Sequence, residues 1–186
     1  GEILSISRAS GKAVTVLTND GTTYELTGTN DVNSGNRGVV VAIADLGRVT
    51  VPWKCLQSVT FSAGHGSGPS RETFAGAEPL RGAVKDETGR TVSGRLVFDL
   101  DEAFRWDIYN GKDQAGFAYN IPFDKLLKIE PGELGVCRVT LRSGTVLILG
   151  EDQDTGEENG GVLVFETPGA APEHITWGQV REVEFW

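Results

Sequence analysis

The sequence is poor in the residues that most often carry chemistry. Its 186 residues include no methionine, two histidines and two cysteines. The histidines, His65 and His174, have no suitably spaced partner, so neither a histidine-based zinc site nor a catalytic triad is expected. The cysteines, Cys55 and Cys137, are too few for a disulfide-rich scaffold. Their positions in the repeat described below predict an exposed Cys55 and an at least half-buried Cys137, and leave open whether they pair.

Basic residues and long apolar runs are also scarce. Lys and Arg number 17 against 26 Asp and Glu, which gives a formal net charge of −9. Such a surface repels a phosphate backbone, so no nucleic-acid partner is expected. No apolar run reaches the roughly 18 residues that a membrane-spanning helix needs. The chain instead has many short β-branched runs, 25 glycines and 7 prolines, which predicts an all-β fold.

One pattern occurs three times along the chain. An aromatic residue follows a β-branched residue by two positions, and apolar residues follow the aromatic by three and by six. The three aromatics are Trp53, Phe123 and Trp177. A turn glycine precedes each of them at a nearly constant distance, at Gly21, Gly89 and Gly144. We interpret the aromatics as a structural signature, packed at the closing turn of a small repeated unit.

The repeat predicts how the chain is divided. We expect a first β unit over residues 9–61, a Gly/Ser/Pro linker over 62–79, a second unit over 80–130, and a third over 134–186 packed on the second. Ile3 and Ile6 precede Gly21 at the same distances at which Leu126 and Ile129 precede Gly144. Residues 2–7 are therefore predicted to be the tail strand of a truncated preceding unit, so that the chain starts inside a repeat.

The middle unit resembles an Sm-like barrel. Residues 89–96 supply a glycine turn and a strand with a second glycine, the acidic Asp99 and Asp101 follow, and residues 121–129 contain a short turn before a last strand. The resemblance covers roughly residues 82–130, and more loosely the other two units. It implies tandem five-stranded SH3-like or Sm-like small barrels, three units plus the tail strand of a fourth. The family's RNA-binding signature is missing from the closing turn at 123–126, so that function does not carry over.

The chain contains the segments Asn30-Asp31-Val32-Asn33 and Asp99-Leu100-Asp101-Glu102. With these segments, the chain as a whole resembles uncharacterised exported bacterial repeat proteins. This similarity implies a periplasmic or extracellular location and attaches no established activity.

Two loops at matching places in the first and third units are rich in side-chain oxygens, which a hard cation such as Ca²⁺ accepts. The candidate ligands are Asp31, Asn33 and Asn36 in one loop, and Asp152, Asp154 and Asn159 in the other. Their spacing is not that of an EF-hand, and Asp and Asn also suit tight turns through bonds to their own backbone. Turn formation is the favoured interpretation, with a calcium site as the alternative.

Two further groups could carry function. Asp99 and Asp101 are paired carboxylates of the kind that hydrolases use, although no nucleophile or oxyanion element accompanies them. Trp106 and Tyr109 have no aromatic counterpart in the other units, so they are the candidates for a surface binding site.

The sequence therefore predicts a non-enzymatic interaction or scaffold module that binds a protein, peptide, glycan or small ligand between units. The first alternative is a calcium-stabilised surface or adhesive module, and the second is a hydrolase that uses Asp99 and Asp101. The sequence leaves the oligomeric state open.

Overall fold

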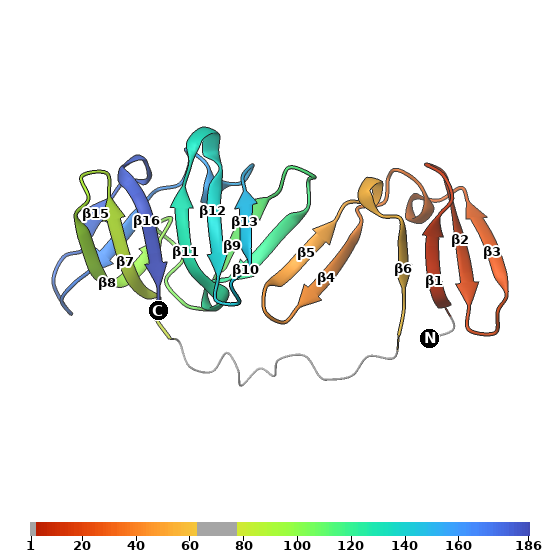
Figure 1. The fold of residues 1–186 in the computed structure, drawn as a ribbon, viewed down its shortest axis with the longest axis horizontal. Helices are drawn as coiled ribbons and strands as arrows, with labels where there is room; N and C mark the ends of the chain where they lie inside the picture. The colour runs from red at the N-terminus through yellow and green to blue at the C-terminus, as the bar shows by residue number, and fades with distance from the viewer. Residues whose placement is uncertain (1–2, 63–77) are drawn as a thin grey trace. The chain divides into compact units, whose positions relative to one another are not determined.

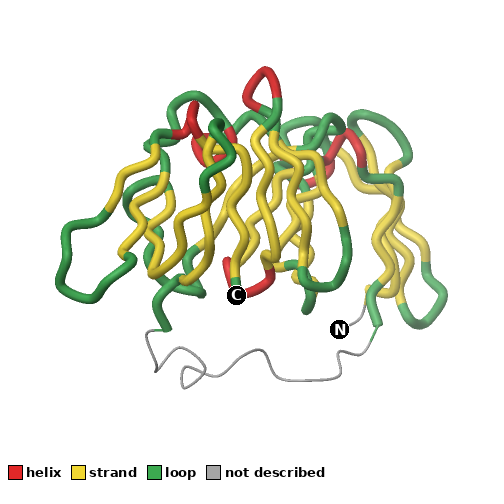
Figure 2. Tube along the Cα trace, turned by 60° about the vertical axis from the view of Figure 1, so that its left-hand side comes forward, coloured by secondary structure: helices red, strands yellow, loops and turns green. Residues whose placement is uncertain are grey.

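A computed structural model describes residues 3–62 and 78–186 of the chain. The all-β prediction is confirmed, because the chain is built of antiparallel strands and the helical segments in the described part are short 3-10 turns at strand ends (Figure 2). None of these helical segments is long and apolar enough to span a membrane. Most of the predicted linker, including His65, lies outside the described residues.

The chain forms two compact units, which are described separately (Figure 1). Among the described residues, the first unit comprises 3–41 and 50–62, and the second comprises 42–49 and 78–186. Residues 42–49 thus group with the second unit, although the sequence pattern places them in the first repeat.

The first unit contains a four-stranded sheet in the order β3-β2-β1-β6. Its strands are β1 (Ile3–Arg8), β2 (Ala13–Thr18), β3 (Thr23–Thr27) and β6 (Ser58–Thr60). Ile6 of β1 lies opposite Val16 on one side and Val59 on the other. Val14, Val16, Val32, Trp53 and Leu56 form a small buried cluster. The 3-10 turns are η1 (Asn30–Val32) and η2 (Trp53–Cys55).

The second unit contains an eight-stranded sheet in the order β13-β12-β11-β16-β7-β8-β14-β15. The strands are β7 (Arg81–Asp86), β8 (Thr91–Phe98), β11 (Leu126–Pro131), β12 (Cys137–Leu141), β13 (Val146–Leu149), β14 (Val162–Phe165), β15 (Glu173–Ile175) and β16 (Val180–Phe185). Ile129 of β11 lies opposite Val139 and Val183, which repeats the pairing of Ile6 in the first unit. The second and third repeats interleave their strands in this sheet, since β11 pairs with β12 and β16, and β16 also pairs with β7.

A second four-stranded sheet has the order β4-β5-β10-β9, from β4 (Val39–Ile43), β5 (Gly47–Val51), β9 (Ile108–Lys112) and β10 (Ala118–Pro122). Within the second unit, Gly47 has φ +119°, and a Cβ there would lie 2.4 Å from the carbonyl oxygen of Asn120. Only glycine fits this close approach to β10.

The core of the second unit is centred on aromatic side chains. Phe98 contacts Tyr109, Phe123 and Trp177, with ring centroids 5.9, 5.4 and 5.5 Å away. The remaining 3-10 turns are η4 (Phe123–Lys125), η5 (Glu133–Gly135), η6 (Gln153–Thr155) and η7 (Trp177–Gln179). Each aromatic of the repeated signature therefore opens a 3-10 turn, at η2, η4 and η7, and its side chain is buried.

Candidate functional site

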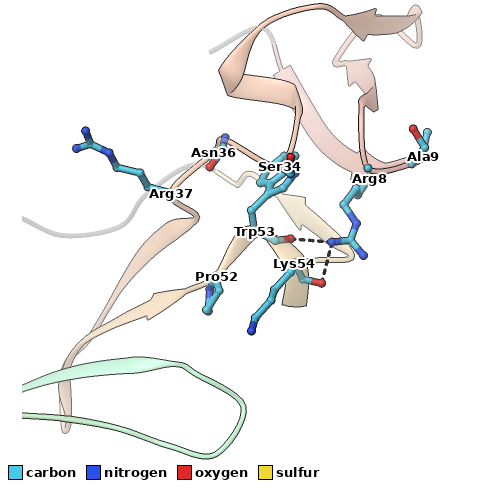
Figure 3. A pocket seen from close by; sticks show the side chains of 10 residues that line it. Arg8, Ala9, Ser34, Asn36, Arg37, Pro52, Trp53 and Lys54 are labelled. Atoms are coloured by element: carbon cyan, nitrogen blue, oxygen red, sulfur yellow. Dashed lines mark hydrogen bonds between the residues drawn. The ribbon is translucent and has the colours of Figure 1, made fainter. Parts of the chain in front are cut away.

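A hollow in the first unit has a basic rim. It has a volume of about 610 Å³ and is lined by Arg8, Ala9, Ser10, Gly11, Ser34, Asn36, Arg37, Pro52, Trp53 and Lys54 (Figure 3). These residues come from the end of β1 and the turn after it, from the loop before β4, and from the turn η2. Three of them are basic and none is acidic, in a chain of net charge −9.

The three cations differ in how they are held. The Nη1 of Arg8 donates to the carbonyl oxygens of Trp53 (2.9 Å) and Lys54 (2.7 Å), which fixes the guanidinium against η2 (Figure 3). Arg37 and Lys54 are exposed and form no ion pair with any residue of the described part. The hollow thus presents positive charge that the surrounding side chains do not neutralise.

A hollow of about 330 Å³ occupies the matching place in the second unit. Its lining includes Trp177, which matches Trp53, and the turn 131–135, which follows β11 as 8–11 follows β1. The charges differ, because Ser10 and Ser34 are replaced by Glu133 and Glu157 at the matching positions. In the same alignment Lys54 is replaced by Gly178, and Arg37 is replaced by Gly160. Arg181 also lines the second hollow, so its charged residues are two acids and one base, whereas the charged residues of the first hollow are all basic.

In the two loops that contain the candidate calcium ligands, asparagine side-chain oxygens accept hydrogen bonds from the backbone of the same turn. In the first, the backbone N–H of Gly35 donates to Asn33 Oδ1 and that of Gly38 donates to Asn36 Oδ1, each at 2.7 Å. Asn36 Nδ2 in turn donates to the Asp31 carbonyl oxygen at 2.7 Å. These bonds are the turn chemistry that Asp and Asn supply, and they engage the side-chain oxygens of Asn33 and Asn36.

The matching loop of the third repeat is more buried. Asn159 repeats the pattern of Asn36, accepting from the N–H of Gly161 at 2.8 Å and donating to the Asp154 carbonyl oxygen at 3.0 Å. Asp152 caps η6 by accepting from Gln153 N–H. The Asp154 carboxylate accepts from the N–H of Asn110 in β9, so this loop also ties the third repeat to the second.

Asp99, Asp101 and Glu102 lie together, with one carboxylate oxygen of each within 4.8 Å of the others. Asp99 accepts from Gly160 N–H and from Gln153 Nε2 (2.9 Å), so its carboxylate joins β8 to the loop 151–160. The paired carboxylates predicted for a hydrolase are thus partly engaged in holding two repeats together.

Two carboxyl groups here are strongly perturbed. Burial, the bond to Asp101 and the charge of Asp154 raise the pKa of Glu102 to about 9. Burial, partly offset by the bond from Asn110, raises the pKa of Asp154 to about 6. At neutral pH Glu102 is therefore protonated, which reduces the repulsion within the group.

The expectation that Trp106 and Tyr109 mark the surface is corrected at one of the two. Tyr109 is completely buried in β9, with its ring edge-on to Phe98, and burial raises its pKa well above its ordinary value. Tyr109 has no aromatic counterpart in the other repeats because it fills a core position that only the middle repeat has. Trp106 is partly exposed and stacks on Phe104 with ring centroids 5.2 Å apart.

The two cysteines lie where the repeat predicts. Cys55 is exposed at the end of η2 and Cys137 is buried in β12. Burial raises the pKa of the Cys137 thiol to about 11, so this thiol is unreactive at neutral pH.

Arg8, Arg37 and Lys54 are not among the residues that the sequence predicts as a site. A signal for them was present in the aligned repeats, because Lys54 stands where the other repeats have Asp124 and Gly178. A position at which the charge differs between repeats is a better candidate for function than a position at which the residue stays the same, because the unchanged residues serve the shared fold.

Fold and site together define an all-β protein with two hollows, lined by matching sequence segments, that differ in charge. Comparisons with protein-family models, with curated proteins and with solved structures find no match for the chain.

Proposed function

We propose that the protein is a non-enzymatic interaction module, built of small Sm-like or SH3-like β repeats, that binds a carboxylate-bearing peptide at the hollow of its first unit. The observation that carries the proposal is the rim of Arg8, Arg37 and Lys54 around this hollow, in a chain that is otherwise acidic. A peptide partner is one of the classes that the sequence predicts.

A carboxylate fits these groups. Arginine and lysine donate charge-assisted hydrogen bonds, and the planar guanidinium can pair two donors with one carboxylate. Arg8 is held in place by the backbone of η2, which lowers the entropy that binding would cost at this side chain.

Burial of the aromatic side chain favours a peptide over a glycan. Sugar sites rely on an exposed aromatic face, whereas Trp53 is only 7% exposed. Peptides can instead bond through backbone and carboxylate groups to the polar rim, which includes Ser10, Ser34 and Asn36.

A non-enzymatic role is supported by how two of the clustered acids are used. Asp99 and Asp154 accept backbone N–H bonds that join the second and third repeats. Their carboxylates serve the fold, so the hydrolase alternative is not the one we propose. We also propose a periplasmic or extracellular location, which is what the resemblance drawn from the sequence implies.

The test is a titration of the protein into a fluorescently labelled hexaglutamate peptide, followed by anisotropy at an ionic strength of about 20 mM, where charge interactions are weakly screened. We expect saturable binding that weakens with added salt. The double variant Arg37→Ala and Lys54→Ala should weaken it roughly 3- to 30-fold, since each exposed charge pair contributes up to about 1 kcal/mol.

A charge-matched control removes one lysine and one arginine outside the hollow, Lys12→Ala and Arg48→Ala, which are both exposed. This control should bind as the parent does. Equal weakening by both double variants, or no binding at low salt, would contradict the proposal. Binding of a uronic-acid oligosaccharide without binding of hexaglutamate would overturn the choice of a peptide.

A further inference from the structure

The first unit exposes apolar side chains that are enclosed at the matching positions of the second unit. Phe61 follows β6 and is 48% exposed, whereas Phe185 of β16 is 1% exposed. Val41 of β4 is 41% exposed, whereas Val164 of β14 is 1% exposed. Phe61 and Phe185 each lie eight residues after a signature tryptophan, Trp53 or Trp177. Val41 and Val164 each lie three residues after a glycine of positive φ, Gly38 or Gly161.

In the second unit, one hairpin covers both matched positions. Its first strand, β7, pairs with β16 and places Gly82 opposite Phe185. Its second strand, β8, pairs with β14 and places Leu96 opposite Val164. The hairpin β7–β8 therefore fills the space between β16 and β14, and its residues Val84, Leu96 and Phe98 are completely buried.

The first unit has no such hairpin in the described part of the chain. There β6 pairs with β1 alone, and β4 is the end strand of its sheet. Unpaired strand edges next to exposed apolar side chains are sites at which another strand adds.

We propose that β6 and residues 39–41 of β4 form a docking surface for a further β unit of the kind seen at residues 78–130. The incoming hairpin would pair its first strand with β6 and its second with β4, as β7 and β8 pair with β16 and β14. This proposal does not depend on the hollow or on a carboxylate ligand.

The second repeat also shows what such a hairpin requires. A Cβ on Gly82 would lie 2.1 Å from the Glu184 carbonyl oxygen, and one on Gly94 would lie 2.3 Å from that of Phe165. The docking hairpin thus needs a glycine in each strand where it meets β6 and β4.

A second copy of the chain is not the occupant that we propose. Its own residues 78–130 are already engaged, because β7 pairs with β16 and β8 pairs with β14 within the same unit. The partner that we propose is a polypeptide segment other than residues 78–130. It carries a β hairpin of this kind whose outer strand edges are not yet paired.

The docking proposal can be tested by adding a second copy of the hairpin to the N-terminus, because the residues from Gly1 onward match those that follow Phe123. A duplicate of residues 78–123 is joined directly to Gly1 of the full chain, so that β1 follows it at the position that β11 has after Phe123. Hydrogen exchange is then measured by mass spectrometry on the fused and the parent chains. We expect amides of β6 and of residues 39–41 to exchange at least ~10-fold more slowly in the fused chain.

Two controls test the mode of docking. The fused chain with Gly82→Val in the duplicate alone should lose the protection, because the valine side chain cannot approach β6. The fused chain with Phe61→Asp and Val41→Asp should also lose it. Because both side chains are over two-fifths exposed in the parent, these changes should leave the first unit folded, which circular dichroism of the matching parent variant checks.

A synthetic peptide of residues 80–98, added to the parent chain at high concentration, keeps the proposal testable if the duplicate misfolds. Slower exchange at the same amides supports the proposal. Unchanged exchange with both the duplicate and the peptide overturns it. Protection that depends on parent concentration, together with a dimer in sedimentation, would identify a second copy as the occupant and also overturn it.

Discussion

The two units share one strand register but differ in how far they enclose their apolar side chains. Ile6, Val16 and Val59 meet in the first unit as Ile129, Val139 and Val183 meet in the second. Leu26 of β3 is nevertheless 45% exposed, while Leu149 at the matching position of β13 is completely buried. The difference shows that the sequence of one repeat determines how its strands pair. Its apolar side chains become buried only when the strands of a second repeat pack against them.

The same comparison applies to polar groups. The hollows beside Trp53 and Trp177 have the same framework, but one carries Lys54 where the other has Gly178. The residues that the two hollows share support the fold. We propose that the side chains that differ between them bind the peptide.

The largest expected effect is at the matched phenylalanines. Phe185→Ala should lower the free energy of unfolding of the second unit by about 3–5 kcal/mol, because it leaves a cavity beside Phe123. Phe61→Ala should cost less than about 1 kcal/mol, because the side chain is already half exposed. Urea unfolding followed by tryptophan fluorescence measures both. Equal losses would show that the two units are covered to the same extent.

A smaller effect is expected at the matched asparagines. Asn159→Ala removes two hydrogen bonds in a buried loop and should cost about 2–3 kcal/mol. Asn36→Ala removes the same two bonds in a partly exposed loop, where water can replace them, and should cost about 1 kcal/mol. Thermal unfolding of the two variants gives the comparison, and a larger loss at Asn36 would contradict it.

The raised pKa values of Glu102 and Asp154 predict a pH dependence of the stability of the second unit. Because the folded state holds these protons more tightly than the unfolded state, the free energy of unfolding should fall as pH rises from about 4 towards 9. Glu102→Gln should flatten this fall and stabilise the second unit at pH 8 by about 1 kcal/mol, after allowance for partial exposure. Urea unfolding at pH 5 and pH 8 measures the change.

The matched control for this variant is Glu158→Gln, which removes the same charge from an exposed position. The control should leave the slope of stability against pH unchanged. The same slope in all three proteins would show that Glu102 is not the group that titrates.

The smallest expected effect is that of calcium. Because Asn33, Asn36 and Asn159 use their oxygens in turns, the melting temperature should be the same in Ca²⁺ and in EDTA. A bound ion at a hundredfold excess over its Kd would stabilise the fold by about 2.7 kcal/mol, which a melt detects readily. An upward shift with Ca²⁺ would restore the calcium alternative.

Much of the local structure could be predicted from the sequence. The turn glycines Gly21 and Gly144 both have positive φ and lie between paired strands, as their positions in the repeat indicate. The aromatic signature predicted the closing turns because the aromatic and the apolar residues after it recur at fixed spacing. The independent small barrels of the Sm-like resemblance stay a prediction.

The pairing between repeats could not be predicted in the same way. Alternation along β16 shows that its residues face a core, but it does not show that β7 is the strand beside it. The prediction of a surface position for Tyr109 is wrong for a related reason, because the lack of a counterpart in the other repeats does not distinguish a surface residue from a core residue. It instead fills space next to Phe98 and Phe123 that only the combined repeats create.

The most direct test of the central claim is residue-resolved hydrogen exchange on the unmodified chain, comparing β6 with β16 and residues 39–41 with 162–164. If the first unit leaves open the edges that the second unit closes, amides of β16 and β14 that bond to β7 and β8 should exchange at least ~100-fold more slowly than their counterparts in β6 and β4. Equal protection at the matched positions would contradict the account.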